Sequence, residues 1–266
     1  MIEIIYCNGC SHSAGGGLEV SKDLEDGTNV RDYYYSKYKV WWHDQIETTY
    51  ANRLAEMIGC DVENEAASGG GTGRVIRMAY DFVKRNWHRK DKLLLLFELP
   101  TFFQRIDLYS TKLQDWVIVN QSFNDKGIRT NLAAVRKYYV PEYLNDELLI
   151  GKNVIDTYLN SFVNIDIETQ KMNREIDTFL TFLKHNEIKF IYFEGNPIEL
   201  TSDYVLPNRF HLEYNNKIYT DFHNWIMANG YTIASECDNK TYDLHPGYFG
   251  HIKFAETLYD YIKDII

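Results

Sequence analysis

Short apolar runs alternate along the chain with longer segments whose apolar residues recur every three or four positions. The short runs have the length of buried strands, and the longer segments have the spacing of amphipathic helices. We expect strands at 2–7, 60–65, 92–97 and 188–193, with a short fifth strand at 231–234. We expect helices at 45–58, 74–88, 167–185 and 249–265. This alternation predicts a parallel sheet whose crossover helices cover both faces.

The expected fold class is therefore α/β: a three-layer α/β/α sandwich around a parallel, flavodoxin-like sheet of about five strands. Two segments, 17–44 and 103–164, do not follow the alternation. Both come after expected strands, where α/β proteins place functional loops. We interpret them as insertions in a single domain, 1–266, that shape the mouth of a substrate site. Inside the second insertion, 116–119 alternates like a strand and 142–149 has helical spacing.

Composition narrows the class of protein. The 266 residues are 45% hydrophobic and 25% charged, as in an ordinary globular protein, and the net charge of −10 argues against a nucleic-acid-binding face. The 21 tyrosines suit a surface that holds sugars or other protein chains. The chain opens directly on a strand pattern, so neither a signal peptide nor a membrane span is expected. We expect a cytoplasmic protein, or one associated with a virus particle if it is phage-encoded.

Three residues near the two ends of the chain suggest nucleophilic catalysis. Ser11 follows the first expected strand, at the sheet edge where open parallel sheets place their sites. A serine hydroxyl is weak alone and needs a neighbouring base. Asp243 and His245, just before the last helix, are two residues apart, so a carboxylate could orient an imidazole. Ser11 could instead cap a following helix.

Three blocks of sequence resemble those of the SGNH (GDSL) hydrolases, in the family's order. The segment 8–15 opens Asn-Gly-Cys-Ser, a variant of the first block found among phage and bacterial members, and 64–70 resembles the second block. The segment 243–251 matches the last block, Asp-x-His-Pro. The resemblance implies that Ser11 is the nucleophile and that Asp243 and His245 complete a triad. It also implies that the backbone N–H groups of Ser11 and of Gly69 or Gly70 form the oxyanion hole.

The third block departs from the family pattern. Where the family has Gly-x-Asn-Asp, this chain has Phe-Glu-Leu-Pro-Thr at 97–101. The missing Asn normally donates its amide to the oxyanion, and loss of one such donor typically costs about 10²–10³ in rate. Thr101 is the candidate replacement through its hydroxyl, with Gln104 and Arg105 as further candidates.

The leading hypothesis is a serine hydrolase that acts on a small ester, such as an O-acetylated carbohydrate, without a cofactor or metal. The alternative is a weak or inactive SGNH-fold binding or structural module, in an oligomer or a phage particle. Cys7 and Cys10 have C-x-x-C spacing, but Cys7 lies inside the first expected strand, which favours a buried thiol over a redox pair. Metal binding by Asp243, His245 and His12 lacks the usual ligand spacing.

Overall fold

The computed structural model describes residues 1–15, 24, 26–39, 49–67, 70–99, 106–110, 115–124, 127–134, 165–195, 210, 212–214, 217–219, 221–239 and 242–263. Its centre is a parallel sheet of β1 (Ile4–Asn8), β2 (Asp61–Asn64), β3 (Leu93–Leu99) and β7 (Lys189–Glu194). The strand order is β2-β1-β3-β7. The fold class is therefore α/β, as the alternation predicted.

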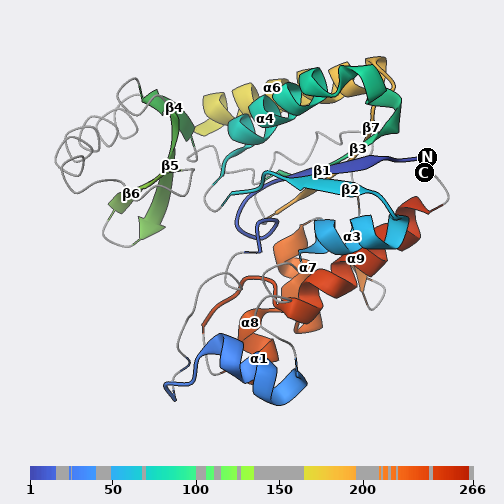
Figure 1. The fold of residues 1–266 in the computed structure, drawn as a ribbon. Helices are drawn as coiled ribbons and strands as arrows, with labels where there is room; N and C mark the ends of the chain where they lie inside the picture. Colours follow the sequence, from blue (N-terminus) through green and yellow to red (C-terminus); the bar gives the residue numbers. More distant parts are fainter. Residues whose placement is uncertain are drawn as a thin grey trace.

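Helices cover both faces of this sheet (Figure 1). One face is covered by α4 (Thr72–Arg85) and α6 (Ile165–His185), and the other by α3 (Tyr50–Ile58), α7 (Phe222–Asn229) and α9 (Tyr248–Ile262). Alternate residues of each strand face opposite layers, so Ile5 packs with the α3–α9 side and Tyr6 with the α4–α6 side. The strands of a sheet buried on both faces must be apolar throughout, which explains the run of leucines in β3.

The expected helices and strands of this sheet form close to their predicted limits, with one exception at the start of α3. Residues 45–48 of the expected helix lie outside the described residues, and α3 begins at Tyr50, because Thr49 is extended and its side chain accepts the Asn52 N–H as an N-cap. Its end is as predicted, since Gly59 adopts the left-handed conformation with φ 78°.

The parallel sheet has four strands in the described part of the chain, not five. The expected strand at 231–234 is wrong: Thr232 makes a single antiparallel bridge to Pro246, and α8 (Ile233–Glu236) begins immediately afterwards. Thr232 caps this short helix by accepting the Ser235 N–H. The capping preference of threonine outweighs the strand preference of the apolar residues that surround it.

Both expected insertions contain regular structure. The first contains α1 (Val30–Tyr38), whose Tyr33 and Tyr34 pack with Ile233 and Cys237. The second contains an antiparallel sheet of β4 (Ile106–Ser110), β5 (Asp115–Asn124) and β6 (Gly127–Ala134), and β5 includes the strand expected at 116–119. The helix expected at 142–149 lies outside the described residues. The short strands β8 (Leu212–Tyr214) and β9 (Lys217–Tyr219) pair before α7, and a 3-10 helix, η1 (Trp87–Lys92), precedes β3.

None of the helices in the described ranges combines the length and apolar character that crossing a membrane requires.

The α9 helix has no side chain of its own to cap its N-terminus, where Gly247 is the cap residue. The carboxyl group of Glu236 in α8 takes this role from outside, accepting the N–H groups of Phe249 (3.3 Å) and Gly250 (3.0 Å) and the Tyr34 hydroxyl. This carboxyl group therefore joins α1, α8 and α9.

The Glu236 contact predicts a pH-dependent stability. Burial raises the pKa of Glu236 to about 7, against the opposing hydrogen bonds from Tyr34 and the start of α9. A carboxyl group with a raised folded-state pKa loses stabilising free energy as the pH rises from its unfolded pKa toward its folded pKa. Relative to Glu236→Gln, the natural protein should therefore lose about 2 kcal/mol of unfolding free energy between pH 5 and pH 8. Urea denaturation of both proteins at both pH values measures this change. If the two proteins differ in unfolding free energy by the same amount at pH 5 and at pH 8, the prediction is wrong.

Candidate active site

Ser11 lies in a turn that follows β1 directly, which we call the Ser11 turn (residues 9–15). The Ala14 N–H donates to the Cys10 carbonyl at 3.0 Å and closes the turn. At the end of β1, the Asn8 side-chain oxygen accepts the Gly9 N–H (2.8 Å) and a guanidinium N–H of Arg74 (3.0 Å). The turn therefore starts from a fixed position at the carboxyl end of the sheet.

Asp243 and His245 lie in the loop that precedes α9, and this loop is held by backbone hydrogen bonds to the start of α8. The Ile233 N–H donates to the His245 carbonyl at 2.9 Å, and the Ala234 N–H donates to the Asp243 carbonyl at 2.8 Å. Because both carbonyl groups are bound, the two side chains project from a backbone that is fixed at each of their positions.

The structure brings Ser11, His245 and Asp243 into one hydrogen-bonded chain. The Ser11 Oγ lies 2.9 Å from the His245 Nε2, and the His245 Nδ1 lies 2.7 Å from the Asp243 Oδ1. The same carboxylate oxygen accepts the His245 backbone N–H at 3.0 Å. A carboxylate at Nδ1 requires the ring proton there, which leaves the Nε2 lone pair facing the Ser11 hydroxyl. This arrangement can deprotonate the serine as it attacks an electrophile.

The expected oxyanion-hole residues are placed only in part. Among the described residues, the Ser11 backbone N–H has no acceptor, so it is available to a ligand. The Gly70 N–H donates to the Ala67 carbonyl at 2.9 Å in a turn that leaves no room for a Cβ at Gly70. Gly69 and Thr101 lie outside the described residues. The oxyanion roles of all four predicted groups therefore stay predictions.

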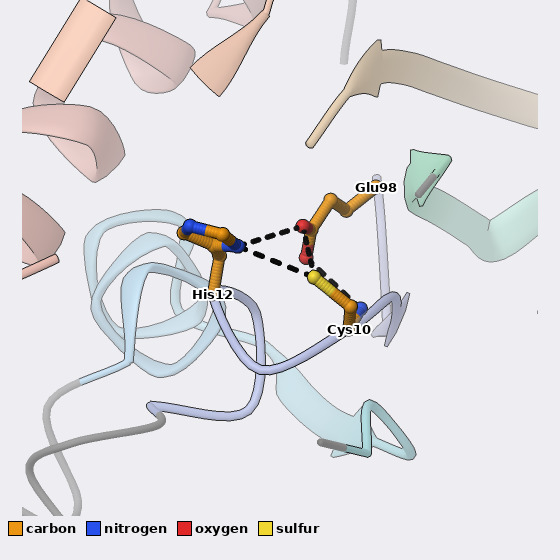
Figure 2. Close-up of side chains that lie close together, drawn as sticks. All are labelled: Cys10, His12 and Glu98. Carbon is orange, nitrogen blue, oxygen red and sulfur yellow. Dashed lines mark hydrogen bonds and ion pairs between the residues drawn. The ribbon is translucent and has the colours of Figure 1, made fainter. Parts of the chain in front are cut away.

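A buried carboxylate, Glu98 near the end of β3, lies beneath the Ser11 turn. Figure 2 shows Cys10 and His12 both turned toward it. The Glu98 Oε1 accepts the Cys10 thiol at 2.7 Å and pairs with the His12 Nδ1 at 3.4 Å. Burial opposes ionisation of Glu98, but the hydrogen bonds and charge of His12, with those from Cys10 and Ser13, outweigh it and lower the pKa to about 2. Burial likewise opposes protonation of His12, but Cys10 and Glu98 raise its pKa to about 10.

Three further histidines lie near His12 or in the core behind it. The His12 ring centroid is 5.4 Å from that of His245 and 5.7 Å from that of His223, which stands at the start of α7. Burial, and then the charge of His12, lower the pKa of His223. His251 lies fully buried in α9 and accepts the Tyr50 N–H. Its pKa is lowered to about 3, chiefly by burial, so it is neutral at physiological pH.

The cysteines are free thiols. Burial raises the pKa of Cys7 to about 12, and its sulfur contacts the Tyr50 hydroxyl at 3.3 Å, as expected of a buried thiol in a strand. The atoms of Cys10, His12 and Glu98 are the one set in the described residues that could hold a metal ion, since they lie within 4.8 Å of one another. Each already bonds to the others, so the set is complete as a hydrogen-bonded network.

Sequence reasoning missed the role of Glu98, although a signal was present. A carboxylate inside a run of buried apolar residues must have partners, because an unpaired buried charge is very costly. It also missed the structural role of Asn64 in the second block, whose amide donates to the Ser13 carbonyl at 3.0 Å. Asn64 therefore fixes the Ser11 turn from β2, while Glu98 fixes it from β3.

The chain matches no family model, and no curated protein matches it. Among solved structures it is similar to a carbohydrate esterase whose active site displays divergent catalytic and non-catalytic binding functions, with 11% identity and a TM-score of 0.44. It is also similar to the acetyl xylan esterase Est2A of the rumen bacterium Butyrivibrio proteoclasticus, with 12% identity and a TM-score of 0.43. The matches cover 98% and 99% of this chain but only 65% and 64% of those two chains. Likeness of this degree bears on neither substrate nor site residues.

The packing around Glu98 predicts that Gly195 tolerates no side chain. A Cβ at Gly195, directly after β7, would lie 2.1 Å from the Glu98 Oε1. Gly195→Ala should therefore displace the carboxylate and reduce the free energy of unfolding by about 3 kcal/mol, as overpacking does. Gly73→Ala is the matched control, because nothing lies within 4 Å of its Cβ and it stands in α4. Chemical denaturation should show that the free energy of unfolding of Gly73→Ala is unchanged or higher by up to about 1 kcal/mol. If the two substitutions change the free energy of unfolding equally, the prediction is wrong.

Proposed function

We propose that this protein is a serine hydrolase that cleaves carboxylic esters. The observation that carries the proposal is the unbroken chain of hydrogen bonds from Asp243 through His245 to the Ser11 hydroxyl, at 2.7 Å and 2.9 Å. Ser11 is the nucleophile, His245 the general base and then the general acid, and Asp243 the residue that orients the imidazole. Burial of the Asp243 side chain, 2% exposed, keeps water from competing for that carboxylate.

The reaction proceeds in two halves. In the first, the Ser11 Oγ attacks the ester carbonyl while its proton passes to the His245 Nε2, which returns it to the leaving alcohol as the acyl-enzyme forms. In the second, a water molecule attacks the acyl group, its proton passes to the same nitrogen, and the acid is released with Ser11 regenerated. The Ser11 backbone N–H stabilises the oxyanion in both halves. Gly69 and Thr101 are further predicted donors, and Gly70 becomes one only when its N–H releases the Ala67 carbonyl.

The substrate we propose is an O-acetylated carbohydrate or another small ester. Its support is the aromatic content of the chain, 15%, with 21 tyrosines, because aromatic faces pack well against sugar rings. A panel of nitrophenyl esters of increasing acyl length, together with acetylated xylan, separates this proposal from a lipid esterase. Preference for acetyl over long acyl groups supports it, and the reverse preference would overturn the carbohydrate assignment.

Substitution of Ser11 tests the function directly. Ser11→Ala should lower the kcat for acetyl ester hydrolysis by about 10⁴–10⁶-fold, because the covalent intermediate can no longer form. A fluorophosphonate probe should label the natural protein at Ser11, as shown by peptide mapping, and should not label the variant. Ser36→Ala is the control, since that hydroxyl bonds the Tyr33 carbonyl within α1. Equal background rates for the natural protein and Ser11→Ala would favour the alternative, a binding or structural module.

A further inference from the structure

Every residue that flanks Ser11 is bound to one carboxylate. Glu98 Oε2 accepts the backbone N–H of Cys10 at 3.1 Å and that of Ser13 at 3.0 Å, along with the Ser13 hydroxyl at 2.5 Å. Its Oε1 accepts the Cys10 thiol and pairs with His12. Ser11 is the residue of this group whose side chain turns away, toward His245. The carboxylate thus holds the backbone on both sides of the proposed nucleophile.

The surroundings of Glu98 are shaped to admit this carboxylate. Its side chain is 0% exposed, and two glycines stand against it, Gly9 on the Ser11 turn and Gly195 after β7. A Cβ at Gly9 would lie 2.5 Å from the Glu98 Cβ. An isolated buried carboxylate would be strongly destabilising, so its retention here depends on the donors that the Ser11 turn supplies. The lowered pKa of Glu98, about 2, agrees with that dependence.

The position of Glu98 follows from strand pairing. Asn8, the last residue of β1, pairs with Phe97 of β3, so the next residue of β3 lies under the first residues of the turn. This is the strand end where the resemblance to SGNH hydrolases places a donor for the oxyanion. A carboxylate accepts hydrogen bonds and cannot donate one to an oxyanion. An effect of Glu98 on the reaction must therefore pass through the Ser11 turn.

We propose that Glu98 is the positioning residue for Ser11: by binding the N–H groups of Cys10 and Ser13 and the ring of His12, it fixes the Ser11 hydroxyl toward His245 and leaves the Ser11 N–H free for the oxyanion. The inference rests on the proposed function. Reactive groups displaced by about 1 Å can lose about 10²-fold in rate, so a rigid turn has a direct catalytic effect. Glu98 touches no reacting atom in this scheme.

The same three side chains allow a second interpretation, a metal site. The Cys10 Sγ lies 3.2 Å from the His12 Nδ1 and 2.7 Å from the Glu98 Oε1. Both separations are shorter than the roughly 3.5 Å that two ligand atoms keep when each lies about 2.0–2.3 Å from a tetrahedral zinc ion. These short separations and the hydrogen bonds among the three side chains favour the positioning role. The experiment must therefore distinguish the positioning role from zinc binding by these three side chains.

Glu98→Gln tests the proposal, because it keeps the side-chain shape and removes the charge. We expect a kcat about 10- to 100-fold lower, a KM changed by less than about threefold, and an equally slower rate of fluorophosphonate labelling at Ser11. Glu63→Gln is the control for loss of a glutamate charge, because Glu63 of β2 pairs with Arg85 at the end of α4, and its kcat and labelling rate should stay at the natural value. Urea denaturation and circular dichroism establish that each variant is folded.

If Glu98→Gln does not fold, Ser13→Ala replaces it, since this change removes one donor to Glu98 and retains the carboxylate. It should lower the kcat and the labelling rate together by about threefold to tenfold. A folded variant with the natural kcat and labelling rate would overturn the positioning role. So would loss of activity on treatment of the natural protein with a chelator, with recovery on added zinc, because that result assigns the cluster to a metal. Absence of both esterase activity and labelling in the natural protein would instead overturn the proposed function, and this inference with it.

Discussion

The pairing of β1 with β3 is the constraint on which the candidate site depends. Five consecutive residue pairs, from Ile4 with Leu93 to Asn8 with Phe97, set the relative height of the two strands. Because side chains alternate in period two, a shift of one residue would exchange the two faces of β1 and turn Tyr6 out of its own core. The register that satisfies both cores is the same register that places Glu98 beneath the Ser11 turn. Core packing and site geometry are therefore specified together.

The other half of the site is brought from the far end of the chain by packing of a different kind. The α9 helix packs on α3, and Phe254 of α9 stacks on Phe222 of α7 at a ring separation of 4.1 Å. These contacts fix α9, and the Glu236 carboxyl group fixes its start. The loop before α9 is fixed by hydrogen bonds to α8. The Ser11–His245 contact spans 234 positions, so no local preference could create it. The contact forms because the fold already holds the backbone of the Ser11 turn and the backbone of the loop that carries His245.

The fold class could be predicted from the sequence because a buried parallel sheet imposes a strong pattern: apolar strands separated by amphipathic helices. The fifth strand was wrong because 231–234 is too short for periodicity to decide, and the Thr232 cap then determined the local structure. The proposed triad could be named because its residues occupy recognisable positions at the strand end and before the last helix. Glu98 could not be assigned a role in this way. Its function depends on which backbone N–H groups surround it, and those come from a turn 85 to 88 positions away.

The charge of Glu98 has a consequence beyond geometry. His12, with its pKa raised to about 10, is protonated at neutral pH, and its ring lies 5.4 Å from that of His245. In the proposed reaction His245 must itself become positively charged as Ser11 attacks, and a nearby uncompensated cation would oppose that step. The Glu98 carboxylate, 3.4 Å from the His12 Nδ1, makes the pair electrically neutral. A single buried carboxylate thus orders the backbone around Ser11 and cancels the charge that its own partner would otherwise place beside the general base.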